Sequence, residues 1–289
     1  MIVSDEITGI LQNALSEDLG TAGDITSLAV FDMSDTGEAL IRCKRSGVLS
    51  GVSLIAPLYK LVDARLSPPI PTKTDVYCSD GDALESGKVI CRISGAVIPI
   101  LSGERVILNL LQHLSGIATV TAKMAEALKG SKTRLLDTRK TTPGLRVLEK
   151  AAVLHGGGFN HRMGLYDMIL IKDTHVKHAG SVKAALTKAL AQRGGQSVPL
   201  IEIEVQTVEQ FFEALPLKPD RIMLDNMSPA EIETCVEGRD ASGLKIELEA
   251  SGGISLFTLP AIATTNVDFI SSGAITHSAP ALDINLVMV

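Results

Sequence analysis

Six short apolar runs, each followed by a stretch with helical periodicity, occupy the chain from residue 134 onward. Repeated β-α units of this length predict a parallel sheet with right-handed crossover connections. Because a complete α/β barrel needs eight strands, we expect an incomplete, six-stranded α/β barrel, with a doubly wound open sheet as the alternative. The predicted strands are RLLDT (134–138), DMILIK (167–172), LIEIEV (200–205), RIMLD (221–225), KIELEA (245–250) and VDFISSG (267–273).

Helices are predicted between these strands. Pro143 suits the first turn of one helix, and Ser228 with Glu231 has the capping-box spacing at the start of another. The remaining helices are predicted at 181–193, 207–215 and near 255–264.

The part of the chain before residue 130 mixes helical and β-like patterns. Its predicted elements are helices at 5–18 and near 53–62, and strands at 38–43, 47–51 and 88–93. Ser102-Gly103-Glu104 then opens a long helix that continues to about Leu128 and ends at Gly130. We place the domain boundary within this long helix, so that the first domain covers 1–115 and the second covers 116–274.

Composition excludes several classes of protein. With 45% hydrophobic and 21% charged residues over 289 positions, the chain is globular and long enough for two domains. Nine aromatic residues, no tryptophan and a net charge of −6 do not suit a nucleic-acid binder. The cysteines form no C-x-x-C pair, so neither a zinc site nor a disulfide framework is indicated. They are Cys43, Cys78, Cys91 and Cys235.

Neither the N-terminal residues nor the most apolar predicted helix indicates a membrane protein. The first residues, MIVSDEITGILQ, carry early acidic residues and no long apolar core, so we expect no signal peptide. The most apolar predicted helix, 106–122, is interrupted by Asn109, Gln112 and His113 and does not resemble a membrane span. We therefore expect a cytoplasmic protein with reduced cysteines and no membrane partner.

All six predicted strands end in polar residues or glycine. In α/β barrels the active site is built at the carboxyl ends of the strands, so we expect these residues to meet at one site. They are Asp137-Thr138-Arg139-Lys140, Lys172-Asp173, Glu204, Asp225-Asn226, Ser251-Gly252-Gly253 and Ser272-Gly273-Ala274.

Positive charge is concentrated in the same region. Residues 132–178 contain nine Lys/Arg and four Asp/Glu, a balance of 9 − 4 = +5 in a chain whose net charge is −6. A solvated basic surface is the simpler explanation, but the charges stand beside TTPG and HGGG rather than along a regular helix face. Because Arg139, His161, Arg162 and Lys172 would repel one another in an empty pocket, we expect a ligand with two carboxylates, a pyrophosphate or both.

Two further groups of residues at the strand ends suggest chemistry. The loops Ser251-Gly252-Gly253 and Ser272-Gly273-Ala274 follow the last two strands, where barrels commonly bind a phosphate through backbone N–H groups. Glu204 and Asp225 could act as an acid/base pair, bind a divalent metal, hold sugar hydroxyls, or simply pair with nearby cations. We expect Glu202 to point to the opposite face of the sheet from Glu204.

Longer motifs extend these observations over essentially the whole chain. They are ALSEDLGTAGDITS (14–27), SGERVILNLLQHLSGIAT (102–119), DTRKTTPGLRVLEK (137–150), GGGFNHRMGLYDMILIKDTH (156–175), IEIEV (201–205), MLDNMSP (223–229), LEASGGI (248–254) and SSGAITHSAPALDI (271–284). Together these motifs resemble the quinolinate phosphoribosyltransferase family, also called nicotinate-nucleotide pyrophosphorylases (carboxylating). The sequence departs from the family at Thr174, where the family usually has Asn.

The resemblance implies a fold and a reaction. The family fold is an N-terminal α/β sandwich and an incomplete α/β barrel in a head-to-tail homodimer, with the C-terminal segment, here 275–289, returning to the first domain. The reaction joins quinolinate to phosphoribosyl pyrophosphate and gives nicotinate mononucleotide, pyrophosphate and CO₂ in de novo NAD biosynthesis. It requires Mg²⁺, bound mainly through the pyrophosphate of the substrate and near Asp225.

The resemblance also implies roles for individual residues. Those implied to hold quinolinate are Arg139, His161, Arg162, Lys172 and, from a second subunit, Arg105. Those implied to be catalytic are Lys140, facing the pyrophosphate, with Glu204 and Asp225 near the ribose. The remaining phosphate and ribose contacts are expected from Asp173, His175, Ser251, Gly252, Gly253, Ser272, Gly273 and Ala274.

Two alternatives remain open. The first is a related phosphoribosyltransferase that acts on another ring acid. The second is a Schiff-base aldolase, in which Lys172 at the end of a barrel strand would be the nucleophile.

Overall fold

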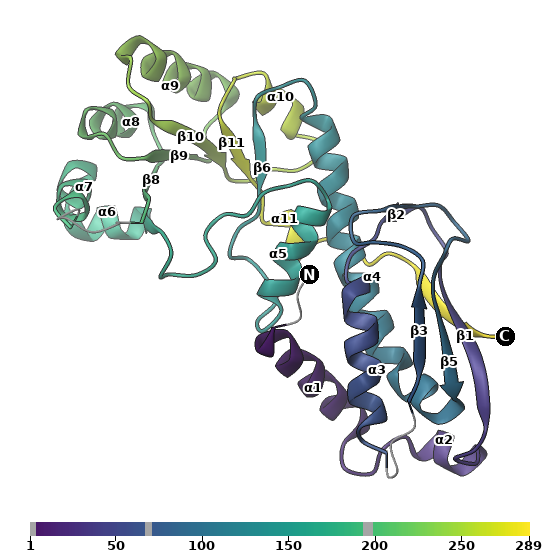
Figure 1. Cartoon of the computed structure of the whole chain (residues 1–289). Coiled ribbons are helices and arrows are strands. Elements are labelled where there is room, and N and C mark those ends of the chain that lie inside the picture. Colours follow the sequence, from purple (N-terminus) through teal and green to yellow (C-terminus); the bar gives the residue numbers. More distant parts are fainter. Residues whose placement is uncertain (1–3, 67–70, 193–198) are drawn as a thin grey trace. The chain divides into compact units, whose positions relative to one another are not determined.

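The computed structural model describes residues 4–66, 71–192 and 199–289. Its contacts divide the chain into two units, each of which has its own sheet (Figure 1). The first unit comprises Met1–Ala122, Thr142–Gly157 and Ala279–Val289, and the second comprises Lys123–Thr141 and Gly158–Ser278. This grouping places residues 142–157 with the first unit, whereas the sequence-based boundaries of 1–115 and 116–274 place them in the second. The domain boundaries themselves stay a prediction.

The first unit is built on a four-stranded antiparallel sheet in the order β12-β1-β5-β3. Alternate residues of β1 are buried, Ala39, Ile41 and Cys43 among them, so one face of this strand belongs to the core. The elements are α1 (Asp5–Leu19), α2 (Ile25–Val30), β1 (Thr36–Cys43), β2 (Gly47–Val48), a 3-10 turn (Val52–Leu54), α3 (Ile55–Asp63), β3 (Lys73–Val76), β4 (Ala83–Leu84), β5 (Val89–Ala96), most of α4 (Val97–Ala127), α5 (Arg146–His155) and β12 (Ile284–Met288).

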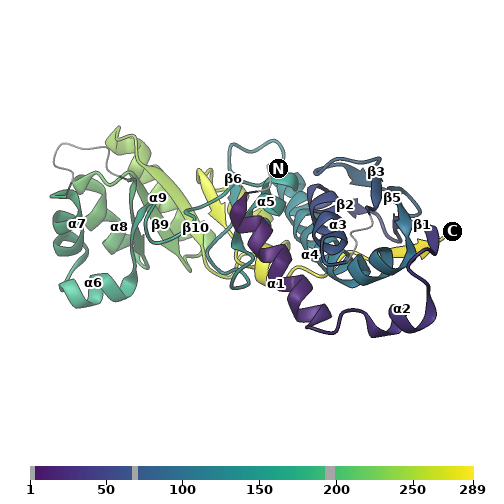
Figure 2. The same cartoon turned by 60° about the horizontal axis from the view of Figure 1, so that its bottom comes forward.

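Helices α3 and α4 lie beside this sheet in both Figure 1 and Figure 2. Tyr59 of α3 is buried, and its hydroxyl donates a hydrogen bond to the carbonyl of Ile100 on α4 at 3.1 Å. A Cβ at Gly103 would lie 2.8 Å from the Tyr59 ring, so this glycine allows the ring to approach α4 closely. The C-terminal strand β12 pairs antiparallel with β1, which joins residues 284–288 to the first unit.

The second unit contains six parallel strands in the order β6-β11-β10-β9-β8-β7. Each new strand from β7 to β11 is added on the same side of the last, and β6 closes the far end next to β11. This order confirms the incomplete barrel and excludes the doubly wound sheet, in which strand addition changes direction. The strands are β6 (Arg134–Leu136), β7 (Ile169–Ile171), β8 (Ile201–Val205), β9 (Arg221–Asp225), β10 (Glu247–Ser251) and β11 (Phe269–Ser271).

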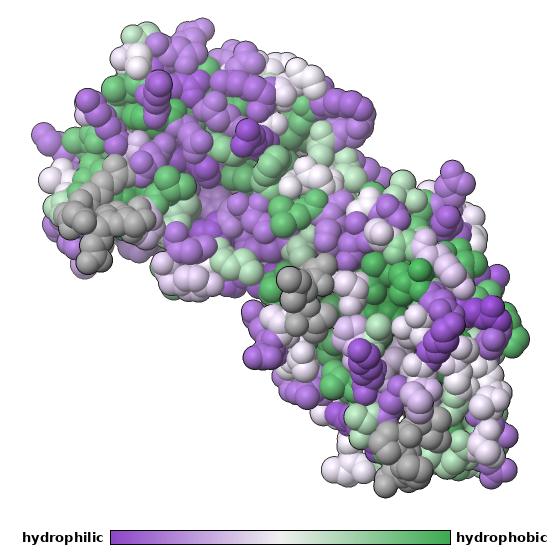
Figure 3. Space-filling model, viewed as in Figure 1, coloured by the Kyte–Doolittle hydropathy of each residue, from purple (hydrophilic) through white to green (hydrophobic). Residues whose placement is uncertain are grey.

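Helices of the second unit cover the outside of this sheet. In Figures 1 and 2, α7, α8 and α9 lie on the outer side of the strands, and Figure 3 shows a hydrophilic surface over α9 at the top of the view. The capping box predicted at Ser228 and Glu231 is present at the start of α9. The helices are α6 (Asp173–Ala179), α7 (Val182–Leu190), α8 (Val208–Ala214), a 3-10 turn (Leu215–Leu217), α9 (Pro229–Ser242), α10 (Leu259–Ala263) and α11 (Ala274–His277).

Several observed elements differ from the sequence-based expectation. The strands β6, β7 and β11 are three residues long, because the polar residues predicted as their ends leave the ladder and form loops. Helix α4 begins at Val97, five residues before Ser102, since Pro99 fits within its first turn. Helix α6 was not expected, and it buries no residue, so no apolar periodicity marks it. The predicted helix 181–193 ends at Leu190, and its last residue lies outside the described residues.

Two further expectations concern the cysteines and the membrane. All four cysteines are buried, and each is a free thiol. Among the described residues, no helix has the length and apolar character needed to cross a bilayer.

Candidate active site

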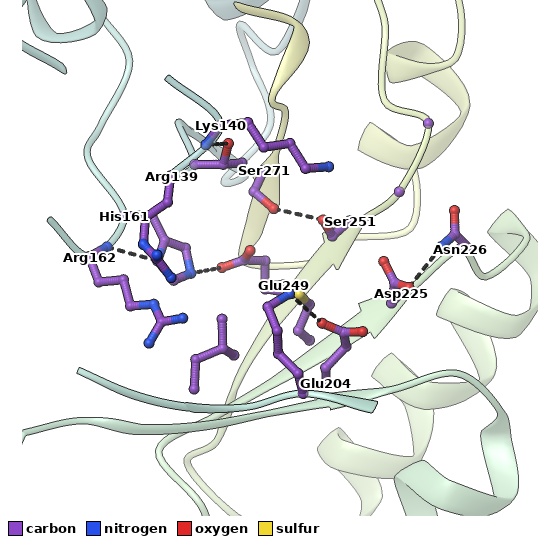
Figure 4. Close-up of a pocket in the computed structure, with 16 residues that line it drawn as sticks. Arg139, Lys140, His161, Arg162, Glu204, Asp225, Asn226, Glu249, Ser251 and Ser271 are labelled. Atoms are coloured by element: carbon purple, nitrogen blue, oxygen red, sulfur yellow. Dashed lines mark hydrogen bonds and ion pairs between the residues drawn. The ribbon is translucent and has the colours of Figure 1, made fainter. Parts of the chain in front are cut away.

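A cavity of about 540 Å³ lies at the carboxyl ends of the parallel strands (Figure 4). Every strand of the sheet contributes to it, either directly or through the loop that follows, so the strand ends meet in one place. All of its lining residues belong to the second unit. They are Thr138, Arg139, Lys140, His161, Arg162, Leu170, Lys172, Glu204, Met223, Asp225, Asn226, Glu249, Ser251, Gly252, Gly253 and Ser271.

The cationic residues that line the cavity, here called the cationic side, are Arg139, Lys140, His161, Arg162 and Lys172. Figure 4 shows Arg139, His161 and Arg162 close together. The guanidinium of Arg162 donates to the carbonyl of Met168 at 3.1 Å, and burial followed by the charge of Arg139 lowers the pKa of Arg162. The buried Nε of Arg139 has no hydrogen-bond partner among the described residues. Because the positive charges of these two arginines repel each other, an anion bound close to both would be stabilised.

Lys140 is positioned by its backbone. Its N–H donates to the hydroxyl of Thr138 at 3.0 Å, and its carbonyl accepts a hydrogen bond from the hydroxyl of Thr276 at 2.8 Å. A Cβ at Gly273 would lie 2.8 Å from Cδ of Lys140, so the lysine side chain passes directly over this glycine. Gly273 therefore contributes space for Lys140, although it does not itself line the cavity.

His161 is fixed on three sides. Its backbone N–H donates to Asp137 at 2.8 Å, and its Nδ1 accepts the N–H of Arg162 at 2.7 Å. Its Nε2 lies 3.1 Å from a carboxylate oxygen of Glu202 and 3.4 Å from one of Glu249. Burial alone would lower the pKa of His161, but the two carboxylates outweigh it and raise the pKa to about 9.

The expected orientation of Glu202 was wrong. Side chains alternate along a strand, so residues two apart, such as Glu202 and Glu204, share a face. Both point into the barrel, where Glu204 lines the cavity and Glu202 is fully buried beside His161. Burial, and next the charge of Glu249, raise the pKa of Glu202 to about 7.

The two carboxylates at the mouth have different partners. Glu204 forms an ion pair with Nζ of Lys172 at 3.1 Å, so the simple pairing considered for it is present. Asp225 accepts a hydrogen bond from the side-chain amide of Asn226 at 2.7 Å. Both carboxylates line the cavity and face the same opening (Figure 4).

A second group of lining residues, here called the glycine side, consists of Ser251, Gly252, Gly253 and Ser271. Gly252 and Gly253 have φ values of 95° and 60°, in the left-handed region that favours glycine. A Cβ at Gly252 would lie 2.3 Å from the side-chain oxygen of Asn226, so no larger residue fits there without displacement. The hydroxyls of Ser251 and Ser271 are hydrogen-bonded to each other at 3.0 Å.

Several predicted site residues do not line this cavity. Ser272 is buried, and its hydroxyl donates to the carbonyl of Ile254; Ala274 begins the short helix α11. Asp173 accepts the N–H of Thr174, and His175 accepts the N–H of Lys172 through Nδ1 at 2.8 Å. Their predicted contacts with phosphate stay predictions.

Arg105 belongs to the first unit, on α4. Its side chain is 59% exposed and lies 3.9 Å from the carboxylate of Glu104. It lines a separate cavity of about 420 Å³ within that unit, together with residues of α1 and the Thr142–Leu145 turn.

Sequence reasoning missed four lining residues, which are Leu170, Met223, Glu249 and Ser271. Leu170 and Met223 form an apolar cluster with Met168, which gives the cavity a nonpolar surface beside its cations. Glu249 was missed although its signal was available, because it stands two residues before Ser251 and therefore shares its face of β10.

Comparisons with known proteins bear on the whole chain. Residues 24–115 match the family described as quinolinate phosphoribosyl transferase, N-terminal domain, and residues 117–287 match its C-terminal domain. A probable nicotinate-nucleotide pyrophosphorylase [carboxylating] of Bacillus subtilis is 43% identical, over 97% of this chain and 93% of that protein. Quinolinate phosphoribosyltransferase [decarboxylating] 1 of Nicotiana glauca is 40% identical, over 97% of this chain and 82% of that protein.

Solved structures agree with this similarity. The nicotinate-nucleotide pyrophosphorylase from Francisella tularensis superposes with a TM-score of 0.88 at 38% identity, covering 99% of this chain and 96% of that one. NadC from Streptococcus pyogenes gives a TM-score of 0.89 at 38% identity, with 98% and 97% covered.

Proposed function

The chain belongs to the quinolinate phosphoribosyltransferase family, and we propose that the cavity in its second unit is the site at which both substrates of that reaction bind. The chain transfers the phosphoribosyl group to quinolinate with loss of CO₂, a step of NAD biosynthesis. The observation that carries the site assignment is the juxtaposition, in one cavity, of five cationic residues, three carboxylates and a glycine loop.

Quinolinate would occupy the cationic side. Its two carboxylates complement Arg139, Arg162 and Lys172, and the planar guanidinium groups can each bind a carboxylate through two hydrogen bonds. The apolar surface of Leu170 and Met223 suits the face of a pyridine ring. His161 would contact the same ligand from the floor of the cavity.

Phosphoribosyl pyrophosphate would occupy the rest of the cavity. The loop of Ser251, Gly252 and Gly253 would hold the 5′-phosphate, because glycine lets backbone N–H groups approach an anion closely. Glu204 and Asp225 would face the ribose, and Lys140 the pyrophosphate. The supporting observation is that these groups line one cavity with the cationic side.

The donor set also suits Mg²⁺, which prefers oxygen ligands and usually binds through one or two carboxylates and the phosphates of a substrate. We propose that the ion binds mainly through the pyrophosphate, with Asp225 as the nearest protein carboxylate. When bound, Mg²⁺ would offset the charge that develops on the departing pyrophosphate.

The proposed mechanism follows from the positions of charge. As pyrophosphate leaves, C1 of the ribose becomes positively charged, which Glu204 and Asp225 can stabilise, while Lys140 stabilises the leaving group. The pyridine nitrogen, held by the clamped carboxylates, attacks C1. The ring nitrogen is then cationic and stabilises the electron pair left on the adjacent ring carbon when its carboxylate departs as CO₂. That carbon then takes up a proton from water, which gives nicotinate mononucleotide. Detection of free nicotinate as an intermediate would contradict this order.

We further propose a homodimer in which Arg105 of one subunit reaches the cavity of its partner. The exposed position of the Arg105 side chain supports this role. A cytoplasmic location is also proposed, since four free, buried thiols suit a reducing compartment.

The test is incubation of the purified protein with quinolinate, phosphoribosyl pyrophosphate and Mg²⁺, with nicotinate mononucleotide and CO₂ measured together. We expect equal release of both, loss of turnover with a chelator, and a fall of about 30- to 1000-fold in Arg162→Ala. The control is Lys188→Ala, which removes an exposed positive charge from α7 in the same unit and should leave turnover unchanged. Turnover of another ring acid, but not of quinolinate, would contradict the proposed use of the cationic side.

The aldolase alternative finds no support in the site. Nζ of Lys172 is engaged in an ion pair with Glu204, whereas a Schiff-base nucleophile must present a neutral amine to a carbonyl group.

A further inference from the structure

At the floor of the cavity and just below it, the barrel interior contains two carboxylates that the proposed reaction does not use. Glu202 of β8 and Glu249 of β10 are both fully buried, and they flank Nε2 of His161 at 3.1 and 3.4 Å. Figure 4 shows Glu249 rising toward the imidazole from the strand below it. Burying two carboxylates side by side is costly, so their retention calls for a function.

We propose that Glu202 and Glu249 are positioning residues that fix the imidazole of His161, and through it the backbone and side chain of Arg162, for binding the dicarboxylate substrate. This inference rests on the proposed function of the cavity and deepens it.

The first step of the argument concerns the two nitrogens of His161. Nδ1 accepts the backbone N–H of Arg162 at 2.7 Å, so in this arrangement Nδ1 carries no proton. The proton of the ring therefore lies on Nε2, which faces the two carboxylates. The carboxylates thus select the tautomer that allows Nδ1 to hold Arg162, as second partners of a histidine commonly do.

The second step concerns the other charges around this group. Arg221 of β9 donates to Glu249 at 3.2 Å and extends outward to Glu247 at 2.8 Å, so it holds Glu249 from the side away from the cavity. Asp137, at the end of β6, accepts the backbone N–H of His161. The raised pKa values of His161 and Glu202 place one extra proton in the cluster near neutral pH. Because Nδ1 accepts an N–H, that proton lies between Nε2 and the carboxylates, and the titration belongs to the cluster as a whole.

The third step weighs a metal ion against this role. The ligand atoms of His161, Glu202 and Glu249 lie within 4.8 Å of one another, which is close enough to hold a cation. However, the guanidinium of Arg221 already occupies one side of Glu249, and Arg139 and Arg162 add positive charge nearby. A positioning role therefore accounts for the cluster better than a metal site.

The test compares Glu202→Gln with a matched control, Glu247→Gln. Both replace a carboxylate by an amide of the same size near Arg221, but Glu247 is about half exposed and does not contact His161. We expect the quinolinate KM of Glu202→Gln to rise by about tenfold or more, the range for outer partners of functional histidines. The KM for phosphoribosyl pyrophosphate should not change, and Glu247→Gln should change neither value.

A double-mutant cycle separates positioning from general damage to the fold. If Glu202 acts through His161, then Glu202→Gln should add little to the effect of His161→Gln. Additive effects, an equal rise in both KM values, or an unchanged quinolinate KM would each overturn the proposal. If Glu202→Gln does not fold, Glu202→Asp keeps the charge but withdraws it from Nε2, and it should show a smaller rise in the quinolinate KM alone.

The wild-type assay distinguishes the two levels of inference. If the wild-type protein does not convert quinolinate, the proposed function itself fails. If the wild-type protein is active and the quinolinate KM of Glu202→Gln is unchanged, only the positioning role fails.

Discussion

The cationic side and the glycine side of the cavity are built from different chemical groups. The cationic side consists of long charged side chains, held in place by partners such as Glu202 and Glu204. The glycine side consists of backbone in a left-handed conformation that a side chain at Gly252 would obstruct. Binding at the cationic side therefore depends on charge, and binding at the glycine side depends on backbone shape. Substitutions on the two sides should affect the two substrates differently.

The largest expected effect is on the cationic side. Arg139→Ala should lower kcat/KM for quinolinate by about 30- to 1000-fold, because it removes a two-hydrogen-bond contact to a carboxylate. Arg139→Lys, which keeps the charge without the planar fork, should recover part of this loss. Steady-state kinetics with each substrate varied would check this. An Arg139→Lys enzyme equal to the wild type would show that charge alone is used.

A substitution on the glycine side should give the reverse selectivity. Gly252→Ala must adopt a φ near 95° and displace Asn226, a strain of about 1–3 kcal/mol. We expect the KM for phosphoribosyl pyrophosphate to rise by roughly one order of magnitude or more, about 1.4 kcal/mol per tenfold, with a smaller change for quinolinate. Gly253→Ala, where the added Cβ meets open space and only the φ of 60° is strained, should raise this KM by less. Equal rises in the KM values for both substrates would contradict the assignment of the glycine side to phosphoribosyl pyrophosphate alone.

The two sides should also differ in how they couple to pH. The folded-state pKa values of His161 and Glu202 are raised, to about 9 and about 7, so the folded protein binds more protons than the unfolded chain. The stability they contribute is present at low pH. It is lost as pH rises through about 7 for Glu202 and through about 9 for His161.

Denaturant titrations at several pH values, followed by circular dichroism, would measure this slope. Glu202→Gln should flatten it, because glutamine does not titrate. Gly252→Ala should lower stability by a similar amount at every pH, because its backbone strain carries no proton. Parallel curves for the wild type and Glu202→Gln would contradict the assignment of the slope to this cluster.

The smallest effect is expected at Gly273, over which the side chain of Lys140 passes. A Cβ at Gly273 would touch only the flexible end of Lys140 and the ring of His277, both of which can move. Gly273→Ala should therefore lower kcat by only a few-fold, about 1 kcal/mol or less, with little change in either KM. A fall in activity as large as that of Arg139→Ala would mean that the Lys140 side chain cannot adopt another conformation around an added Cβ.

Much of this architecture could be predicted from the sequence. The β-α alternation identified all six strands of the barrel, and their polar ends identified most of the cavity, because strand ends of a parallel sheet meet at one edge. The protein family to which the chain belongs could also be recognised from motifs such as those around Arg139 and Arg162. The short strand β3 and the helix α6 carried too little apolar periodicity to be recognised.

The interior of the barrel was less predictable. Glu202 and Glu249 look like ordinary polar positions in alternating strands, and only the packing of β8 and β10 around His161 brings them together. The predicted orientation of Glu202 was wrong because residues two apart in a strand share a face, which the sequence itself indicates. The contributions of Ser272 and His175 depend on hydrogen bonds that residue type does not specify.

The pairing of the first and last strands has a consequence for how the protein is made. In the second unit, β6 at residues 134–136 pairs with β11 at 269–271, and in the first unit, β1 pairs with β12 at 284–288. Contacts so distant in sequence close large loops and slow folding. During synthesis neither sheet can be completed until β11 and β12 have emerged from the ribosome. The nascent chain must therefore keep the edges of β1 and β6 from mispairing for most of its translation.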